Sequence, residues 1–389
     1  MSVLQSISGK NLNNLWQVGR SRLFGIFACA IMRAHLGQAH GGQLVERATR
    51  DGWKNQQGCY VIAEIGLNHN GSFEIASSLI DHAAEAGCNA VKFQRRDVPN
   101  LAINSVLDAE DLRFPSLGKT YRELRERHEF SLDQLAALKS RAESHGVDFF
   151  ATPFDVKSLW DLLELGVDQL KIASHGLTNL PLVEEIAKTG LPTILSTGMA
   201  ELSEIEDAFE ILIGGSAQVA LLHCVSSYPT PDDEARIDLL EVLRHRFGTI
   251  VGYSGHEAGF LTTLVAVANG AKIVERHVTL STEMEGFDHR LSLEPDELGK
   301  MVDSIRRIEK MFGDGSKTIS EAEMVTRNKY RVSMVSREDL IEGETLGADK
   351  VTFKNPGTGI SPKLATEFYG RQLRHSVKRD TLLTSEDFS

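Results

Sequence analysis

From Cys59 onward the chain alternates between short apolar runs and longer stretches in which apolar residues recur at helical spacing. Each apolar run is rich in small and β-branched residues and ends in a polar cluster. The eight runs read CYVIAEIG, NAVKFQ, VDFFATPFD, DQLKIASH, LPTILSTG, QVALLHC, TIVGYSGH and AKIVERH. Nearly continuous apolar character is typical of parallel strands covered on both faces. Eight strand–helix units predict an α/β fold, a (β/α)8 TIM barrel. The alternative is a doubly wound open sheet, but no GxGxxG follows the first run, which weakens its dinucleotide-binding version.

The pattern divides the chain into four parts. Residues 58–313 form the predicted barrel, and a long insertion over 95–146 interrupts its rhythm. Such insertions on barrel loops are usually functional or disordered. Residues 314–328 are interpreted as a linker and 329–389 as a small β-rich domain, because helical periodicity fades there. Residues 1–57 are expected to be a poorly ordered extension. Its apolar stretch LFGIFACAIM is too short to span a bilayer, although a signal or transit segment is the alternative.

Net charge and cysteine spacing argue against some functional classes. The 389 residues carry a net charge of −12, which argues against a nucleic-acid-binding surface. A phosphorylated substrate stays possible because it needs only local positive charge. The four cysteines are scattered and form no CxxC pair, so we expect reduced thiols, a cytoplasmic location and no membrane partner.

Polar and charged residues gather where the predicted strands end. In such barrels the catalytic residues lie at the carboxyl ends of the strands. These ends hold Glu64, Lys92, Gln94, Thr152, Lys171, Ser174, Ser196, Thr197, His223, Ser254, His256, Glu275 and His277. Lys92 and Lys171 stand inside apolar runs, where a lysine is costly unless paired. They suit an anionic substrate, although a structural ion pair with Glu64 is the alternative; His223 is interpreted as structural.

His256 and His277 end the seventh and eighth runs, which are neighbours in a closed barrel. Imidazole suits divalent transition metals, and two histidines with water and substrate oxygens would make an open catalytic site. Glu64 and Asp288 are expected nearby. The alternative is that either histidine is a hydrogen-bonded core residue.

These motifs together resemble the sialic acid synthase family, the phosphoenolpyruvate-dependent N-acetylneuraminate synthases and their relatives. Within residues 58–300 the matching stretches are AEIGLNHNG, AVKFQ, GKTYRELRE, ATPFD, KIAS, LSTGM, HCVSSYPTP, GYSGHE, ERHVTL and GFDHRLSLEPDEL. The tail resembles the family's antifreeze-like (SAF) domain through VSREDLIEGETL, FKNPGTGISP and GRQLRHSVKRDTLLTSEDF.

The resemblance implies that phosphoenolpyruvate condenses with an N-acylated mannosamine-type sugar to give a nine-carbon 2-keto acid and phosphate, with Mn²⁺ or Mg²⁺. It makes His256 and His277 the metal ligands, with Glu275 and Arg276 as supporting charges, and Glu64 the carboxylate that manages protons. The implied phosphoenolpyruvate contacts are Lys92, Thr152, Lys171 and Ser174. The implied sugar contacts are Ser196, Tyr228, Ser254 and Asp288.

The resemblance also implies a homodimer in which the SAF domain of one subunit covers the partner's barrel. The family usually presents an arginine there from a KRPGTG-like turn, whereas this chain reads KNPGTG, with Asn355 at that position. Asn355 brings no charge, and the neighbouring Lys354 could compensate for the missing arginine.

The acceptor stays open at this point. Free N-acetylmannosamine is the first expectation. GKTYRELRERHEF resembles the version in synthases that take the 6-phosphate, and a legionaminic- or pseudaminic-type sugar is a further alternative. Two other readings are a 3-deoxy-keto-acid phosphate synthase on the same barrel and a non-catalytic polysaccharide-assembly protein.

Overall fold

The computed structural model describes residue 53, residues 57–215 and residues 218–389. Most of the predicted N-terminal extension, including LFGIFACAIM, lies outside the described residues. The described residues divide into two compact units, and the boundary in the sequence falls after Phe312. None of the helices among them is long and apolar enough to cross a membrane.

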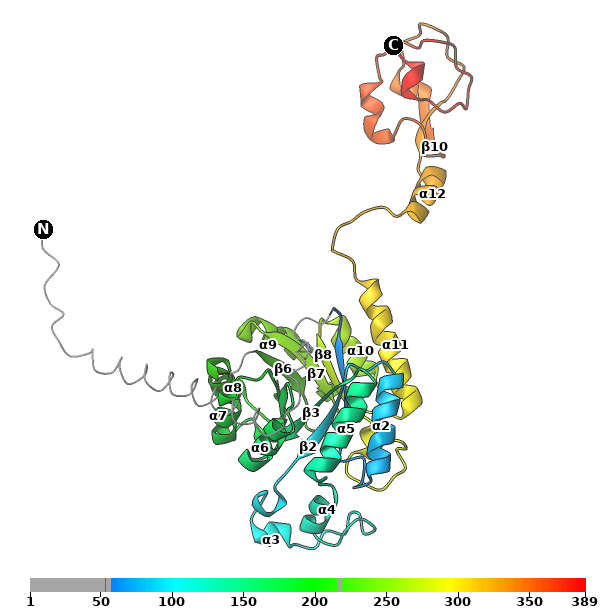
Figure 1. Cartoon of the computed structure of the whole chain (residues 1–389). Coiled ribbons are helices and arrows are strands. Elements are labelled where there is room, and N and C mark those ends of the chain that lie inside the picture. Colours follow the sequence, from blue (N-terminus) through cyan, green and yellow to red (C-terminus); the bar gives the residue numbers. More distant parts are fainter. Residues whose placement is uncertain (1–52, 54–56, 216–217) are drawn as a thin grey trace, which may run out of the picture. The chain divides into compact units, whose positions relative to one another are not determined.

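The first unit is a closed barrel of eight parallel strands in sequential order, with β8 paired to β1 (Figure 1). Its strands are β1 (Tyr60–Gly66), β2 (Ala90–Arg95), β3 (Asp148–Pro153), β4 (Leu170–Ile172), β5 (Thr193–Ser196), β6 (Val219–Cys224), β7 (Ile250–Gly255) and β8 (Ile273–His277). Each of the eight apolar runs coincides with one of them, and only β2 extends beyond its run, by Arg95. The predicted barrel is confirmed.

Helices follow the strands and cover the outside of the barrel (Figure 1). They are α2 (Phe73–Glu85), α5 (Leu132–Ser144), α6 (Val156–Glu164), α7 (Leu180–Lys188), α8 (Leu202–Gly215), α9 (Leu239–Phe247), α10 (Leu261–Ala268) and α11 (Pro295–Met311). Polar caps fix several helix starts: the Ser72 hydroxyl accepts from the Ile75 amide before α2, and Ser131 with Gln134 forms a capping box before α5.

The long insertion between β2 and β3 is ordered. It contributes α3 (Asn104–Leu107) and α4 (Tyr121–Arg127) before α5 packs against α2 on the barrel surface. In Figure 1, α3 and α4 project from the ring of outer helices.

Side chains pointing into the barrel change character along its axis. The part nearer the amino ends of the strands, here called the lower part, is an apolar cluster. Its members are Trp53, Tyr60, Ile62, Ala90, Phe150, Ile194, Ala220, Leu222 and Ile273. Trp53, only 3% exposed, belongs to this cluster although it falls within the predicted extension. The outward-pointing residues pack against the helices in a larger, separate cluster. Because side chains alternate along a strand, the next inward positions after the lower cluster lie at the carboxyl ends.

The second unit has its own core. It contains α12 (Glu321–Tyr330), which begins inside the predicted linker, and the antiparallel pair β9 (Ser333–Ser336) and β10 (Val351–Lys354). Several single antiparallel bridges complete its β-rich part, as expected. Its buried residues include Met334, Leu340 and Phe388.

Candidate functional site

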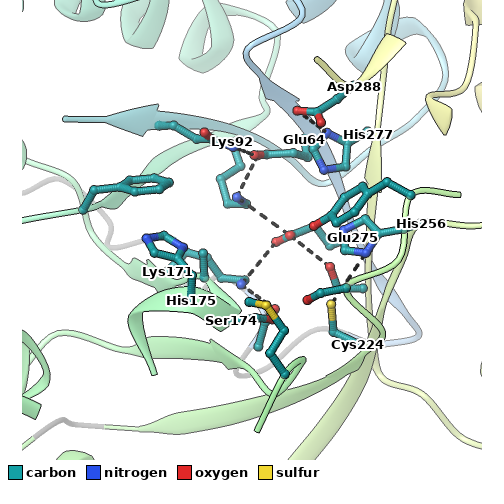
Figure 2. Close-up of a pocket in the computed structure, with 18 residues that line it drawn as sticks. Glu64, Lys92, Lys171, Ser174, His175, Cys224, His256, Glu275, His277 and Asp288 are labelled. Atoms are coloured by element: carbon teal, nitrogen blue, oxygen red, sulfur yellow. Dashed lines mark hydrogen bonds and ion pairs between the residues drawn. The ribbon is translucent and has the colours of Figure 1, made fainter. Parts of the chain in front are cut away.

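The inward-pointing positions at the carboxyl ends of the strands form a polar layer above the apolar cluster. The members of this layer that line one cavity of about 170 Å³ are Glu64, Lys92, Gln94, Lys171, Ser196, Cys224, Ser254, Glu275 and His277. The loops that follow the strands complete the lining with Phe154, Ala173, Ser174, His175, Met199, Ser226, Tyr228, His256 and Asp288 (Figure 2). A stable barrel does not require this layer, so its chemistry points to a ligand.

Two lysines and two glutamates form one buried ionic network on the cavity wall (Figure 2). Lys92 Nζ lies 2.7 Å from Glu64 Oε2 and 3.8 Å from Glu275 Oε1. Lys171 Nζ lies 4.0 Å from Glu275 Oε2 and donates to Ser196 Oγ at 2.6 Å. The strand register supports these contacts, because Glu64 pairs with Lys92 on β2 and with His277 on β8.

The pKa values of the two carboxylates of this network shift in opposite directions. Desolvation raises the pKa of Glu64, although Lys92 opposes the shift. Burial acts on Glu275 in the same way, but the charges of Lys171 and Lys92 outweigh it and lower the pKa. Glu64 is therefore the carboxyl that takes up a proton more readily, while Glu275 stays an anion between two lysines.

His256 and His277 lie near each other on one side of the cavity, with ring centroids 5.6 Å apart (Figure 2). His256 Nδ1 lies 2.8 Å from the carbonyl oxygen of Val225. A carbonyl can only accept, so Nδ1 carries the proton and Nε2 of neutral His256 keeps its lone pair. Burial lowers the pKa of His277 to about 4, which keeps that imidazole neutral. Its Nδ1 is 3.8 Å from Asp288 Oδ2.

These two imidazoles fit a shared divalent ion, because His277 is neutral and the Val225 carbonyl fixes the tautomer in which neutral His256 keeps its Nε2 lone pair for a metal. Among the described residues, no group of three or more His, Cys, Asp or Glu side chains is arranged to hold a metal. The protein would therefore supply two ligands, and water or substrate oxygens the others.

Comparison with known proteins identifies the family. The chain matches the NeuB family over residues 79–317. It is 38% identical to the N,N'-diacetyllegionaminic acid synthase of Campylobacter jejuni over 327 residues, 83% of this chain and 98% of that protein. It is also 38% identical to the N-acetylneuraminate-9-phosphate synthase of Drosophila melanogaster over 347 residues, 82% of this chain and 93% of that protein. The chain belongs to the NeuB family.

A solved structure agrees with this assignment. The N-acetylneuraminic acid synthetase of Leptospira borgpetersenii is 37% identical and superposes with a TM-score of 0.61, covering 69% of this chain and 90% of that one. The resemblance to sialic acid synthases is confirmed, and the chain is an enzyme of this kind.

Most residues predicted from the sequence lie together in this NeuB-family chain. Twelve of them line the cavity: Glu64, Lys92, Gln94, Lys171, Ser174, Ser196, Tyr228, Ser254, His256, Glu275, His277 and Asp288. Thr152 lies behind Lys92, where its hydroxyl accepts from Nζ at 3.2 Å. Asn355 is an exposed residue of the second unit, and the neighbouring Lys354 forms an ion pair with Asp380.

One expectation is wrong. Arg276 was expected to be a supporting charge at the barrel mouth, but it does not line the cavity. Strand alternation turns it outward between Glu275 and His277, where it is fully buried and pairs with Glu257 at 2.8 Å. Glu275, by contrast, lies in the cavity as expected.

His223 also points away from the cavity and contacts the Ala235 carbonyl at 2.8 Å, which fits a structural residue.

Sequence reasoning missed several residues of the NeuB-family cavity: Phe154, His175, Met199, Cys224 and Ser226. Cys224 shares the inward parity of Leu222 on β6, so alternation could have found it, and its Sγ lies 3.8 Å from His256 Nδ1. Phe154 and His175 stack at 4.5 Å between centroids, a contact between two loops with no signal in the sequence.

Proposed function

We propose that this protein condenses phosphoenolpyruvate with the open-chain aldehyde of an N-acylated mannosamine-type sugar. The products are a nine-carbon 2-keto acid of the N-acetylneuraminate type and inorganic phosphate. C3 of phosphoenolpyruvate forms the new bond to the aldehyde carbon. Water adds at C2, and the C2–oxygen link to phosphate is lost from the resulting adduct.

The observation that carries this proposal is the pair of buried lysines facing one cavity. Lys92 and Lys171 come from β2 and β4 and are 2% and 1% exposed. Two buried ammonium groups and the nearby hydroxyls of Ser174 and Ser196 suit the carboxylate and phosphate of phosphoenolpyruvate. Thr152 holds Lys92 in place from behind through its hydroxyl.

The opposite side of the cavity suits the sugar aldehyde. His256 and His277 would hold Mn²⁺ or Mg²⁺, and the ion would act as a Lewis acid that polarises the aldehyde oxygen. Tyr228, whose ring lies 4.2 Å from that of His256, and Asp288 would position the sugar chain. Ser254 donates to Glu275 at 3.2 Å, so it also fixes that carboxylate.

Glu64 is the group we assign to proton transfer at the reacting carbons. Its raised pKa favours proton uptake, and Lys92 beside it can return the proton or stabilise the anion. Gln94 donates to Glu64 Oε1 at 2.6 Å and leaves Oε2 for Lys92.

The small second unit is proposed to act in a homodimer, where it covers the barrel of the partner subunit and presents Asn355 to the sugar. This rests on the family resemblance. An uncharged Asn355 can donate a hydrogen bond to a sugar oxygen, and the neighbouring Lys354 forms an exposed ion pair with Asp380.

The decisive experiment measures phosphate release from phosphoenolpyruvate with Mn²⁺ in the presence of N-acetylmannosamine, its 6-phosphate or a 2,4-diacetamido analogue. We expect acceptor-dependent turnover that falls on the order of 1000-fold in His277→Ala. His223→Gln is the matched control, because His223 is equally buried in the barrel wall but faces away from the cavity. Absence of turnover with every acceptor in a folded, metal-loaded protein would overturn the proposal.

A further inference from the structure

The loop between β8 and α11, residues 278–294, carries Asp288 to the cavity. Within this fully described segment, regular structure is limited to one bridge between Val278 and Leu293 at the base and a short 3-10 helix at His289–Leu291. The strand ladder that fixes the other cavity residues of the barrel does not extend to Asp288. Side chains from elsewhere in the chain must therefore hold this loop in place.

Asn68, two residues after β1, holds both ends of the loop. The residue is 0% exposed. Its Nδ2 donates to the carbonyl oxygen of Val278 at 2.8 Å and to the Ser292 hydroxyl at 2.7 Å. That hydroxyl donates in turn to the carbonyl oxygen of Asp288 at 2.5 Å, so one chain of hydrogen bonds joins Asn68 to the backbone of Asp288. Because these groups are buried, the loss of one partner leaves the others unsatisfied at a cost in free energy.

Asn70 holds the outer part of the same loop. It lies before α2 with a φ of +49°, a left-handed conformation that asparagine adopts more readily than most residues. Its Nδ2 donates to the carbonyl oxygen of Glu285 at 2.8 Å. A Cβ on the next residue of the loop, Gly286, would lie only 2.9 Å from Asn70 Oδ1, so the loop packs closely against the amide. The backbone carbonyl of Asn70 separately accepts from Arg127 of α4 at 3.2 Å.

The two asparagines affect the cavity only through the loop. Neither is among the described residues that line the cavity. The loop that they hold brings Asp288 Oδ2 to 3.8 Å from His277 Nδ1. Lys92 and Lys171, by contrast, project from β2 and β4, which this loop does not carry. The side of the cavity suited to phosphoenolpyruvate is thus fixed independently of the loop.

We propose that Asn68 and Asn70 are positioning residues for the sugar acceptor, which hold loop 278–294 so that Asp288 faces the cavity beside His277. The inference rests on the proposed function, in which Asp288 positions the sugar chain. Asn68 fixes the two ends of the loop, and Asn70 fixes its outer part. Loss of either amide lets Asp288 move away from the acceptor while the lysines that face phosphoenolpyruvate stay in place.

The test measures KM for both substrates in the full-length, Mn²⁺-loaded protein. The acceptor is N-acetylmannosamine or its 6-phosphate, whichever wild type turns over. Asn70→Gly is the first variant, because glycine keeps the left-handed backbone and the carbonyl contact with Arg127 and removes only the side-chain amide. We expect KM for the acceptor to rise about 3- to 10-fold, as for one lost hydrogen bond, while KM for phosphoenolpyruvate changes less than about twofold.

A second variant and a control complete the comparison. Asn68→Ala should raise KM for the acceptor further, because it releases both ends of the loop; if it does not fold, Asn70→Gly decides alone. Asn269→Gly is the matched control. Its exposed amide also donates to a backbone carbonyl at 2.8 Å, that of Val265, but it lies at the end of α10 and outside the described cavity lining. Both KM values should stay at the wild-type level in this control.

The outcomes separate this inference from the proposed function. An unchanged KM for the acceptor in Asn70→Gly, in a protein whose wild type is active, overturns the positioning role and leaves the proposed function intact. An equal rise of both KM values also overturns it, because the substitution would then disturb the whole cavity. Absence of turnover by wild type with either acceptor refutes the proposed function and this inference together.

Discussion

At the scale of single residues, β8 gives consecutive side chains to two different environments. Glu275 and His277 face the cavity, while Arg276 between them faces the outer helices. Arg276 donates to Glu257 and to the hydroxyl of Thr263, and Glu257 also accepts from Tyr253. This buried network fixes the strand from behind, so the cavity residues depend on it without touching it.

We predict that Arg276→Met lowers the free energy of unfolding by about 3–5 kcal/mol, because the Glu257 carboxylate stays buried without its cation. Urea denaturation followed by circular dichroism measures the change. The control is Arg246→Met, which breaks an exposed pair with Glu206 and should change stability by less than about 1 kcal/mol. Equal effects of the two substitutions would contradict a structural role for the buried pair.

At the scale of elements, the packing of β7 against its neighbouring strands depends on a glycine, Gly252. A Cβ on Gly252 would lie 2.3 Å from the Ile273 carbonyl oxygen and 2.6 Å from Leu222 Cδ2. The neighbouring strands therefore approach β7 more closely than any other residue allows. The same strand carries Ser254 into the cavity two positions later, so this close approach affects the site.

Gly252→Ala is predicted to destabilise the barrel by at least about 1–3 kcal/mol, since the contact is with backbone that cannot move away. Thermal unfolding of the full-length protein measures the loss. Gly299→Ala on α11 provides the comparison: a Cβ there meets nothing within 4 Å, and alanine should stabilise the helix by about 0.5–1 kcal/mol. If Gly252→Ala were neutral, the packing described for β7 would be wrong.

The elements also show what the sequence could predict. All eight strands were predictable because each is an apolar run between turn signals, and the histidines at two of their ends stood out. Strand alternation, applied strictly, would have turned Arg276 outward and Cys224 inward. The cavity lined by both Arg96, after β2, and Arg125, on α4, was not predictable. Bringing these two residues to one space needs the path of the insertion, which no periodicity encodes.

At the scale of the whole molecule, the chain has two units with separate hydrophobic cores. The barrel holds the proposed chemistry, and the second unit carries Asn355 on an exposed turn. In the proposed homodimer, each active site combines the barrel of one subunit with the second unit of the other. A chain with a defective barrel can therefore supply an intact second unit to a partner whose own second unit is defective.

We predict that co-expression of His277→Ala and Asn355→Asp chains gives more activity than the two variants have separately. A carboxylate at position 355 should lower turnover at least about tenfold by repelling the anionic substrates. In a random mixture, about a quarter of all barrels are intact and covered by an intact second unit. Phosphate release reports the recovery. Activity no higher than the sum of the two parents would refute the contact in trans.

The cavity of the candidate site shares a wall, Phe154 and His175, with a neighbouring cavity, and this arrangement has an evolutionary consequence. The residues proposed to form the carbon–carbon bond lie at the strand ends, whereas the insertion between β2 and β3 contributes Tyr121 and Arg125 to the neighbouring cavity. Under the proposed function, substitutions in the insertion would change that neighbouring cavity while the bond-forming residues stay the same. After a gene duplication, one copy could change its acceptor specificity without passing through an inactive intermediate.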